Sequence, residues 1–258
     1  LKPFDKPYTW DDLIIASQKL TRDVDGDGKI DQWAFEWAVS LQEFATMVLQ
    51  DGGRVFNEDN TKVVFNSPQG VAVLQFWMDM IYKYKAAPWP RPGGLWAKGL
   101  AGLQYHNEFH VVDYPLAANY KVGFLPFPKS QSPTTCFAGM SFGIFKSDKE
   151  REEAAWKYVK WALSKEPYLM YMTNTAFSPV RRSIQNTPEF KAWIAASQPM
   201  LKERAAIMEY GYRLPPVRQM PQLQDVFKKR IEQAFTEKAD PKKTLDGLVA
   251  EMNDILAK

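Results

Sequence analysis

The spacing of apolar residues predicts helices in several parts of the chain. Thr9 is a preferred N-cap residue, and apolar side chains follow it at helical intervals as far as Leu20, which predicts a helix of about 12 residues. Ser67 followed by Pro68 predicts the first turn of another helix, which continues to about Tyr84.

Three further stretches show helical periodicity. Asp148 is a suitable N-cap for the strongly amphipathic run "DKEREEAAWKYVKWALS". Residues 97–105 ("AKGLAGLQY") predict a helix that ends near "HNEF". Roughly the last 65 residues are mostly helical in pattern.

The strand patterns are shorter than the helical ones. The aromatic segment that begins at Gln32 predicts a strand passing into a helix that stops at Gly52, and residues 63–65 predict a short strand. Residues 136–146 ("CFAGMSFGIFK") predict an apolar strand that is bent or closely approached at Gly139 and Gly143. About five or six short strands separated by helices indicate an α/β layer architecture.

Composition narrows the class of protein. With 258 residues, 45% of them hydrophobic, the chain can bury a sizeable core. The net charge of +3 forms no basic stripe, which argues against nucleic acid as a partner. Cys136 is the single cysteine, so an internal disulfide is excluded and a small buried residue is the simplest interpretation. The lack of a run of about 18 apolar residues predicts a soluble chain whose targeting segment is absent or removed.

The stretch "TRDVDGDGKIDQW" has the spacing of a calcium loop. Its oxygen ligands would be the carboxylates of Asp23, Asp25, Asp27 and Asp31 and the backbone carbonyl of Lys29. Gly28 occupies the turn position, but Ala34 stands where a calcium sensor has a bidentate glutamate, which disfavours a regulatory switch. Two interpretations remain, a structural calcium ion and a charged turn held by Asx hydrogen bonds.

The sequence contains no motif that marks an enzyme. His106 and His110 lie four residues apart with Glu108 between them, but no third metal ligand can be named, so polar residues at a helix end are the simpler interpretation. Nucleophile elbows, phosphate-binding loops and dinucleotide fingerprints do not occur. Two alternatives to a binding protein stay open: a carbohydrate-active enzyme with Glu43 and Glu108 as acid and base, and a calcium-dependent structural module.

Several stretches, taken in order, resemble one family, the extracellular solute-binding proteins of ABC importers. The nearest group is the one that binds sugars and related compounds and includes the maltose-binding proteins. The matching stretches cover nearly the whole chain and are residues 9–35 ("TWDDLIIASQKLTRDVDGDGKIDQWAF"), 49–81, 98–109 ("KGLAGLQYHNEF"), 120–129 ("YKVGFLPFPK"), 137–164 and 177–183 ("FSPVRRS").

The resemblance implies an α/β fold of the type II periplasmic-binding-protein kind, with two hinged lobes and an incomplete first lobe. Residues 1–136 and 195–258 would form the second lobe, and residues 137–194 the hinge strand and the remnant of the first. The implied function is that of a receptor, not an enzyme, which captures a sugar or sugar-like solute by closing and delivers it to a membrane permease. No cofactor is required.

The resemblance also implies a location and a further partner. The receptor would work in the periplasm or outside the cell, and a missing N-terminal part would be the place for membrane anchoring. Another chain could supply the missing N-terminal segment of the first lobe.

Ligand-binding positions follow from the same resemblance. In sugar-binding members aromatic faces stack on the sugar ring, while carboxylates, amides and backbone groups bind its hydroxyls. The matching positions are Trp37, Gln42, His106, Asn107, Glu108, Phe109, Gly139, Met140, Ser141, Phe177, Arg181 and Arg213. Several of these residues also fit an ordinary structural role without a ligand. Trp37 and Phe109 fit aromatic rings of the hydrophobic core, and Arg181 and Arg213 fit solvent-exposed charges. Glu108 is the strongest candidate. Phosphorylated polyols stay open as ligands because either arginine could meet a phosphate.

Overall fold

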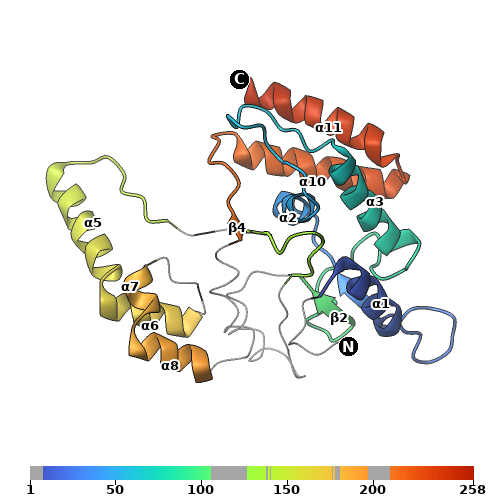
Figure 1. Cartoon of the computed structure of the whole chain (residues 1–258), viewed down its shortest axis with the longest axis horizontal. Helices are drawn as coiled ribbons and strands as arrows, with labels where there is room; N and C mark the ends of the chain where they lie inside the picture. The colour runs from blue at the N-terminus through green and yellow to red at the C-terminus, as the bar shows by residue number, and fades with distance from the viewer. Residues whose placement is uncertain are drawn as a thin grey trace. The chain divides into compact units, whose positions relative to one another are not determined.

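The chain divides into two compact units, each described here by itself (Figure 1). The computed structural model describes residues 8–105, 127–137, 139, 141–175, 177, 181–196 and 210–258. Unit 1 comprises residues 1–105, 125–137 and 206–258, and unit 2 comprises residues 106–124 and 138–205. Unit 1 is therefore assembled from three separate stretches of chain.

Local capping explains where the helices of unit 1 begin. These helices are α1 (Trp10–Leu20), α2 (Leu41–Gln50), α3 (Pro68–Tyr82), α10 (Met220–Glu237) and α11 (Pro241–Leu256). The predicted N-cap Thr9 is confirmed, because its Oγ1 accepts a hydrogen bond from the Asp12 amide (3.1 Å) while the Asp12 carboxylate accepts one from the Thr9 amide (3.0 Å). Ser67 is likewise the N-cap of α3 and accepts from the Gly70 amide at 3.3 Å.

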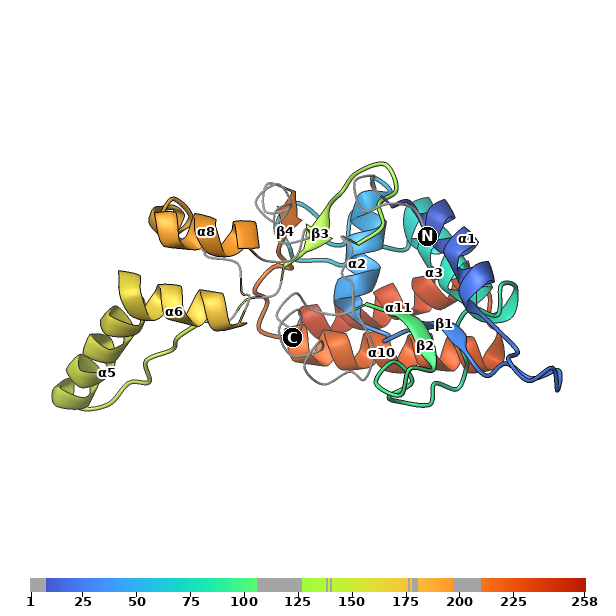
Figure 2. The ribbon, with the colours of Figure 1, turned by 90° about the horizontal axis from the view of Figure 1, so that it is seen from below.

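Unit 1 contains two small parallel sheets. β1 (Trp33–Glu36) pairs with β2 (Ala101–Gln104), with Trp33 opposite Ala101 and Glu36 opposite Gln104. β3 (Thr135–Cys136) pairs with β4 (Gly211–Tyr212). Figure 2 shows α2 lying between β3 and the pair of helices α10 and α11.

The helix expected over residues 97–105 is wrong, because this segment forms strand β2. Gly99 has a positive φ of 72°, which ends any helix there, and Gly102 adds low helix propensity. Pairing with β1 then decides the conformation. The short strand expected at residues 63–65 is reduced to an isolated bridge between Val63 and Phe56.

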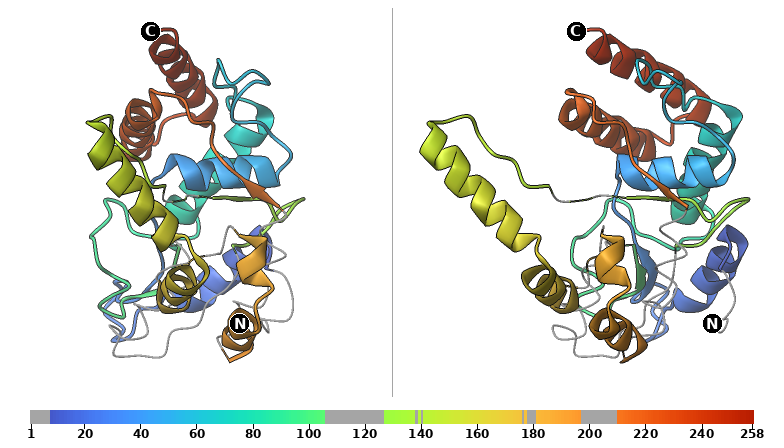
Figure 3. Two further views of the ribbon diagram at one scale, coloured as in Figure 1. Left: turned by 90° about the vertical axis from the view of Figure 1, so that its left-hand side faces the viewer. Right: turned by 60° about the vertical axis from the view of Figure 1, so that its left-hand side comes forward.

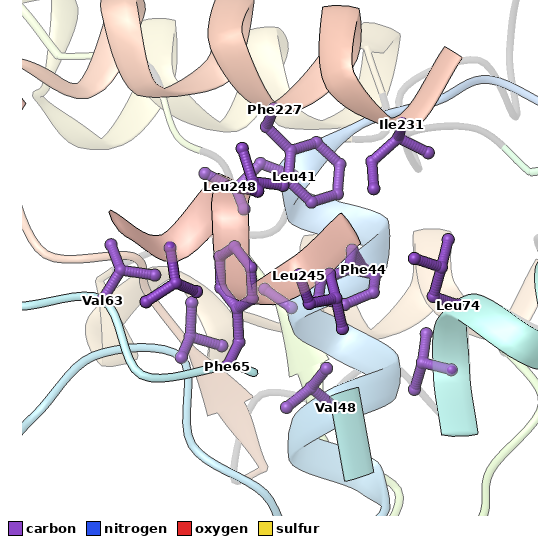
Figure 4. Close-up of a cluster of buried hydrophobic side chains, with 14 of the residues drawn as sticks. Leu41, Phe44, Val48, Val63, Phe65, Leu74, Phe227, Ile231, Leu245 and Leu248 are labelled. Carbon is purple, nitrogen blue, oxygen red and sulfur yellow. The ribbon is translucent and has the colours of Figure 1, made fainter. Parts of the chain in front are cut away.

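One aromatic core joins the first and third stretches of unit 1 (Figure 4). The Phe44 ring of α2 lies 5.2 Å from the Phe65 ring, 5.5 Å from the Trp77 ring and 5.2 Å from the Phe227 ring of α10. α11 closes the same core, and the side chain of its Asn253 exchanges two hydrogen bonds with the backbone of Val63. Residues near the two ends of the sequence therefore stabilise each other.

Unit 2 is helical and has a small core in the part described. Its helices are α5 (Lys149–Ala162), α6 (Lys165–Thr175), α7 (Arg182–Gln185) and α8 (Pro188–Ala196) (Figure 3). The predicted N-cap Asp148 is confirmed by its bond from the Arg151 amide at 2.9 Å. Of the apolar strand expected over residues 136–146, the described residues have only Cys136 in a strand, at the end of β3. Residues 141–147 belong to no strand, because no neighbouring strand is present in the described chain to pair with them.

Candidate functional site

Two parallel strands end at the same edge of unit 1. Trp37 directly follows β1 and Tyr105 directly follows β2, and α2 begins nearby at its N-cap Ser40. The crevice outside the carboxyl ends of parallel strands is where α/β proteins usually bind ligands. We call the place defined by Trp37, Glu43, Gln104 and Tyr105 the carboxyl edge.

Trp37 is a half-buried ring fixed from several sides. Its ring lies 4.9 Å from that of Phe35 and edge-on to that of Trp77 at 5.3 Å, and its carbonyl accepts a hydrogen bond from the Arg91 guanidinium at 3.2 Å. Its indole Nε1 is buried and has no hydrogen-bond partner in the described part of the chain. Trp37 is thus partly a core residue, and its indole N–H is a hydrogen-bond donor without a partner among the described residues.

A small hollow lies beside Trp37. Its volume of about 10 Å³ has room for roughly one water molecule, so it is no sugar pocket. The hollow is lined by Trp37, Val39, Trp77, Ile81, Ala87, Pro88, Trp89, Arg91 and Phe235.

Glu43 is a buried acid in the first turn of α2, with only 1% of its surface exposed. The Ser40 hydroxyl donates to its Oε2 (3.3 Å), and its Oε1 has no partner among the described residues. Burial raises the pKa of Glu43 well above its ordinary value, and the opposing effects of the Ser40 hydrogen bond and the Arg91 charge are smaller. Burial thus favours the protonated form of Glu43, and the buried side chain offers no exposed atom to a substrate.

The polar face of α2 holds the segment that runs from unit 1 into unit 2. The Cys136 amide donates to Thr46 Oγ1 at 3.0 Å, and the Gln50 side chain donates to the Thr134 carbonyl at 3.0 Å. Burial, partly offset by the Thr46 hydrogen bond, raises the pKa of Cys136 to about 11. The thiol is thus protonated at neutral pH and is a poor nucleophile.

Two polar residues at this edge, Gln104 and Tyr105, were not identified from the sequence. Burial, the Glu43 carboxyl and the Cys136 thiol raise the pKa of Tyr105, and its ring packs edge-on to Phe127 at 4.8 Å. Gln104 Oε1 is buried and lacks a partner in the described chain. Both residues lay in the segment expected to be a helix, so the sequence pattern gave no sign that they end a strand.

Three buried side-chain polar atoms lack a hydrogen-bond partner within the described ranges. Among the described residues they are Trp37 Nε1, Glu43 Oε1 and Gln104 Oε1, and all three belong to the carboxyl edge. A buried donor or acceptor without a partner costs about 1–3 kcal/mol. Such groups are rare in folded proteins and concentrate where function requires them.

The other predicted ligand positions are dispersed over the two units. Gln42 is half-buried in the first turn of α2, beside the carboxyl edge, while Arg213 is exposed just after β4. Gly139, Ser141, Phe177 and Arg181 belong to unit 2. His106, Asn107, Glu108, Phe109 and Met140 lie outside the described residues.

Two of the unit 2 positions have structural contacts of their own. The Arg181 guanidinium donates to the Leu163 carbonyl at the carboxyl end of α5, where a positive charge is favourable. The Phe177 ring stacks on that of Tyr171 at 5.6 Å. These contacts explain both side chains without a ligand, and they leave the predicted ligand roles untested.

The acidic loop gathers oxygen atoms at the surface. Carboxylate oxygens of Asp23, Asp25 and Asp27 lie within 4.8 Å of one another. Backbone amides of the loop also donate hydrogen bonds to these carboxylates, since the Asp23 carboxylate accepts from the Gly26 amide (2.6 Å) and from the Gly28 amide (2.8 Å). The Lys29 side chain forms an ion pair with Asp27 (2.8 Å), and the Asp31 carboxylate accepts a hydrogen bond from the Val24 amide (2.7 Å). Ala34, where a calcium sensor has its glutamate, is fully buried in β1.

The fold is that of a solute-binding protein. Residues 1–168 match the model of the bacterial extracellular solute-binding protein family, and the chain belongs to this family. The chain is also 19% identical over 218 residues to the maltotriose-binding protein of Pyrococcus abyssi (strain GE5 / Orsay), a match that spans 81% of this chain and 46% of that protein.

Solved structures with the same fold cover nearly the whole chain. The maltose/maltodextrin-binding domain of Bdellovibrio bacteriovorus, bound to maltotriose, has a TM-score of 0.83 at 19% identity over 100% of this chain and 68% of that one. The cyclic alpha-maltosyl-1,6-maltose binding protein of Arthrobacter globiformis has a TM-score of 0.81 at 24% identity, and the match covers 99% of this chain and 66% of that one.

These likenesses confirm the expected α/β fold of the periplasmic-binding-protein type. The chain spans about half the length of its curated relative and about two thirds of these solved ones. None of the helices in the described part is long and apolar enough to cross a membrane.

Proposed function

We propose that the chain acts in a receptor that captures a sugar or sugar-like solute and delivers it to the permease of an ABC importer. The observation that supports this most is the set of unpaired buried polar atoms beside an aromatic ring at the carboxyl edge. A polyhydroxylated ligand, with or without bridging water, supplies donors and acceptors for such atoms, and its apolar face suits the Trp37 ring. Periplasmic-binding proteins gain affinity by closing two lobes around the ligand.

In this proposal residues 1–136 and 195–258 form the second lobe, and residues 137–194 form the hinge strand and part of the first. The chain passes between the units after Phe137 and returns before β4, so the β3 and β4 pair is the proposed hinge, steadied from α2 by Thr46 and Gln50. Trp37 and Gln42 would bind ligand from the second lobe. The remaining proposed ligand residues are His106, Asn107, Glu108, Phe109, Gly139, Met140, Ser141, Phe177, Arg181 and Arg213.

The partners and the location are proposed with the function. The protein partners are the transmembrane subunits of a permease. The receptor would be periplasmic or extracellular. It would need no catalytic group, and the pair of Glu43 and Glu108 as acid and base of a carbohydrate-active enzyme remains the second candidate function.

Isothermal titration with maltotriose tests the receptor proposal. We expect saturable binding, and Trp37→Ala is expected to weaken it by about 10-fold to 100-fold, which is about 1.4–2.8 kcal/mol. Trp37→Phe keeps an aromatic face and removes Nε1, so its affinity should lie between the two. Trp156→Ala, which removes an exposed indole in unit 2, should bind like the wild type.

Two outcomes would reject this proposal. Cleavage of maltotriose without saturable binding would favour the enzyme. Equal affinity of the wild type and the Trp37 variants for maltotriose would show that the carboxyl edge is not part of the ligand site.

For the acidic loop we propose a structural calcium ion held by Asp23, Asp25, Asp27, Asp31 and the Lys29 carbonyl. The ion would brace the turn between α1 and β1. Thermal unfolding in calcium should occur several degrees higher than in chelator, because a ligand that binds only the folded state stabilises it by about 2.7 kcal/mol at 100 times its Kd.

Asp25→Asn should abolish this shift. Asp59→Asn, in another exposed turn held by its own carboxylate, should retain it. Equal melting temperatures with and without calcium would reject the structural ion and support the charged turn held by Asx hydrogen bonds. A large change in circular dichroism on calcium removal would favour the calcium-dependent module.

A further inference from the structure

Residues 88–100 form a surface loop that is held in place by a side chain of β1. We call this segment the proline-glycine loop. Glu36, the last residue of β1, is 5% exposed, and its carboxylate accepts hydrogen bonds from two amides of the loop. The Gly94 amide donates to Oε1 (2.9 Å) and the Trp96 amide to Oε2 (2.7 Å). Both oxygens of one buried carboxylate therefore fix the middle of the loop to the end of the strand.

The loop in turn holds the residue that follows Glu36. The Arg91 guanidinium donates to the backbone carbonyl of Trp37 at 3.2 Å. The pairing of β1 with β2 ends at Glu36, so this carbonyl lies beyond the sheet and needs another donor. Two successive residues of the chain are thus tied to the loop in opposite senses, because Glu36 holds the loop and the loop holds Trp37.

Helix α10 anchors the other end of the loop. The Trp89 indole donates to the Thr236 hydroxyl at 3.1 Å, and its ring packs edge-on against that of Phe235 at 5.1 Å. The backbone is therefore fixed on both sides of Arg91, at Trp89 and at Gly94. Such anchoring keeps an exposed arginine within reach of one carbonyl.

Two further observations place Arg91 at the carboxyl edge. Its side chain lines the small hollow beside Trp37. Burial raises the pKa of Glu43, and the positive charge of Arg91 opposes this effect by lowering the same pKa. Because a charge acts most strongly at short range, the guanidinium lies near the buried acid as well as near Trp37.

We propose that Arg91 and Glu36 are positioning residues that set the orientation of Trp37 for a ligand at the carboxyl edge. Arg91 fixes the Trp37 backbone directly, and Glu36 fixes the loop that carries Arg91. Neither residue contacts the ligand.

The packing of Trp37 explains why its backbone matters. One side of the ring is fixed by Phe35 (4.9 Å) and Trp77 (5.3 Å), so a movement of the Trp37 carbonyl turns the ring against these neighbours. An aromatic face that is already oriented binds more tightly, because less conformational freedom is lost on binding. The ligand in this inference rests on the proposed function, whereas the orientation of Trp37 can be measured without a ligand.

A double-mutant cycle tests whether Arg91 acts through Trp37. In titrations with maltotriose, Arg91→Ala should weaken binding about fivefold, the usual effect of one lost hydrogen bond. Arg91→Lys keeps a charged donor and should restore most of the affinity. In the Trp37→Ala background, Arg91→Ala should cause no further loss, because the two residues act as a unit.

Arg22→Ala is the matched control for Arg91→Ala. It also removes an exposed guanidinium of unit 1 that donates to a backbone carbonyl, that of Lys19 at 3.3 Å. Its affinity for maltotriose should equal that of the wild type.

Fluorine NMR of protein labelled with 5-fluorotryptophan reports on the ring itself. The chain has nine tryptophans, and Trp37→Phe identifies the Trp37 signal by its absence. Without ligand, Arg91→Ala should shift or broaden this signal, and Arg22→Ala should leave it unchanged. Glu36→Gln keeps one acceptor oxygen but turns an NH₂ group toward one of the two amides, so it should also shift the signal. Arg91 is exposed, so Arg91→Ala keeps the test valid if Glu36→Gln fails to fold.

Three results would overturn the proposal. These are an unchanged Trp37 signal in Arg91→Ala, equal affinity of Arg91→Ala and the wild type for maltotriose, and an equal loss of affinity with and without the Trp37 ring. The last would mean that Arg91 contacts the ligand itself. Absence of maltotriose binding by the wild type would instead reject the receptor proposal, and the fluorine signal would then decide whether Arg91 and Glu36 orient Trp37.

Discussion

Phe44→Ala is expected to lower the free energy of unfolding of unit 1 by about 3–5 kcal/mol, the usual cost of deleting a buried phenylalanine ring. Phe44 has no exposed surface, and its ring contacts those of Phe65, Trp77 and Phe227. The substitution leaves a cavity between α2, α3 and α10 and removes three aromatic pairs. Urea denaturation followed by tryptophan fluorescence would measure the loss.

The matched control is Phe145→Ala, which deletes the same ring where it is 91% exposed. This change should alter stability by no more than about 0.5 kcal/mol. If both variants lost the same stability, Phe44 would not occupy the centre of the core described here.

The wild-type protein is expected to lose stability relative to Glu43→Gln as the pH rises. Burial raises the pKa of Glu43 in the folded state, whereas the unfolded chain releases this proton near the ordinary value of 4.5. The stability that the proton confers is fully present below about pH 4.5 and is lost as the pH rises through the folded-state pKa. Within this window the loss is at most about 1.4 kcal/mol per pH unit.

Glutamine has nearly the same shape as the protonated acid but does not titrate. Denaturant midpoints measured from pH 5 to pH 8 should therefore show a difference that grows in favour of Glu43→Gln. Glu58→Gln removes an exposed carboxylate of the same unit and should follow the wild-type profile. Parallel profiles for the wild type and Glu43→Gln would mean that Glu43 is ionised in the folded protein.

Helix starts were predictable from the sequence because capping is local. The side chains of Thr9, Ser67 and Asp148 each accept a bond from an amide three residues further on, so a short window contains the whole interaction. Strand β2 was not predictable in this way. Its conformation depends on β1, a partner far away in the sequence, and its alanine and leucine also suit a helix.

The candidate site was predictable only in part. The resemblance to the solute-binding family named Trp37 and Gln42, and their ligand role stays a prediction. Gln104 and Tyr105 were missed because their importance comes from the end of β2. Glu43 was considered only as a possible acid or base of a carbohydrate-active enzyme, and the turn of α2 directs it into the interior, where it is 1% exposed. Burial of a single polar side chain depends on packing that a sequence pattern does not contain.

The assembly of unit 1 from distant stretches has a consequence for biosynthesis. The rings of Phe44, Phe65 and Trp77 are synthesised before α10 and α11, the helices that cover them. Contacts of long sequence separation slow folding and leave apolar surface open to aggregation. Unit 1 should therefore reach its native state only after translation of α11, and until then the nascent chain should be a substrate for chaperones that hold unfolded polypeptides.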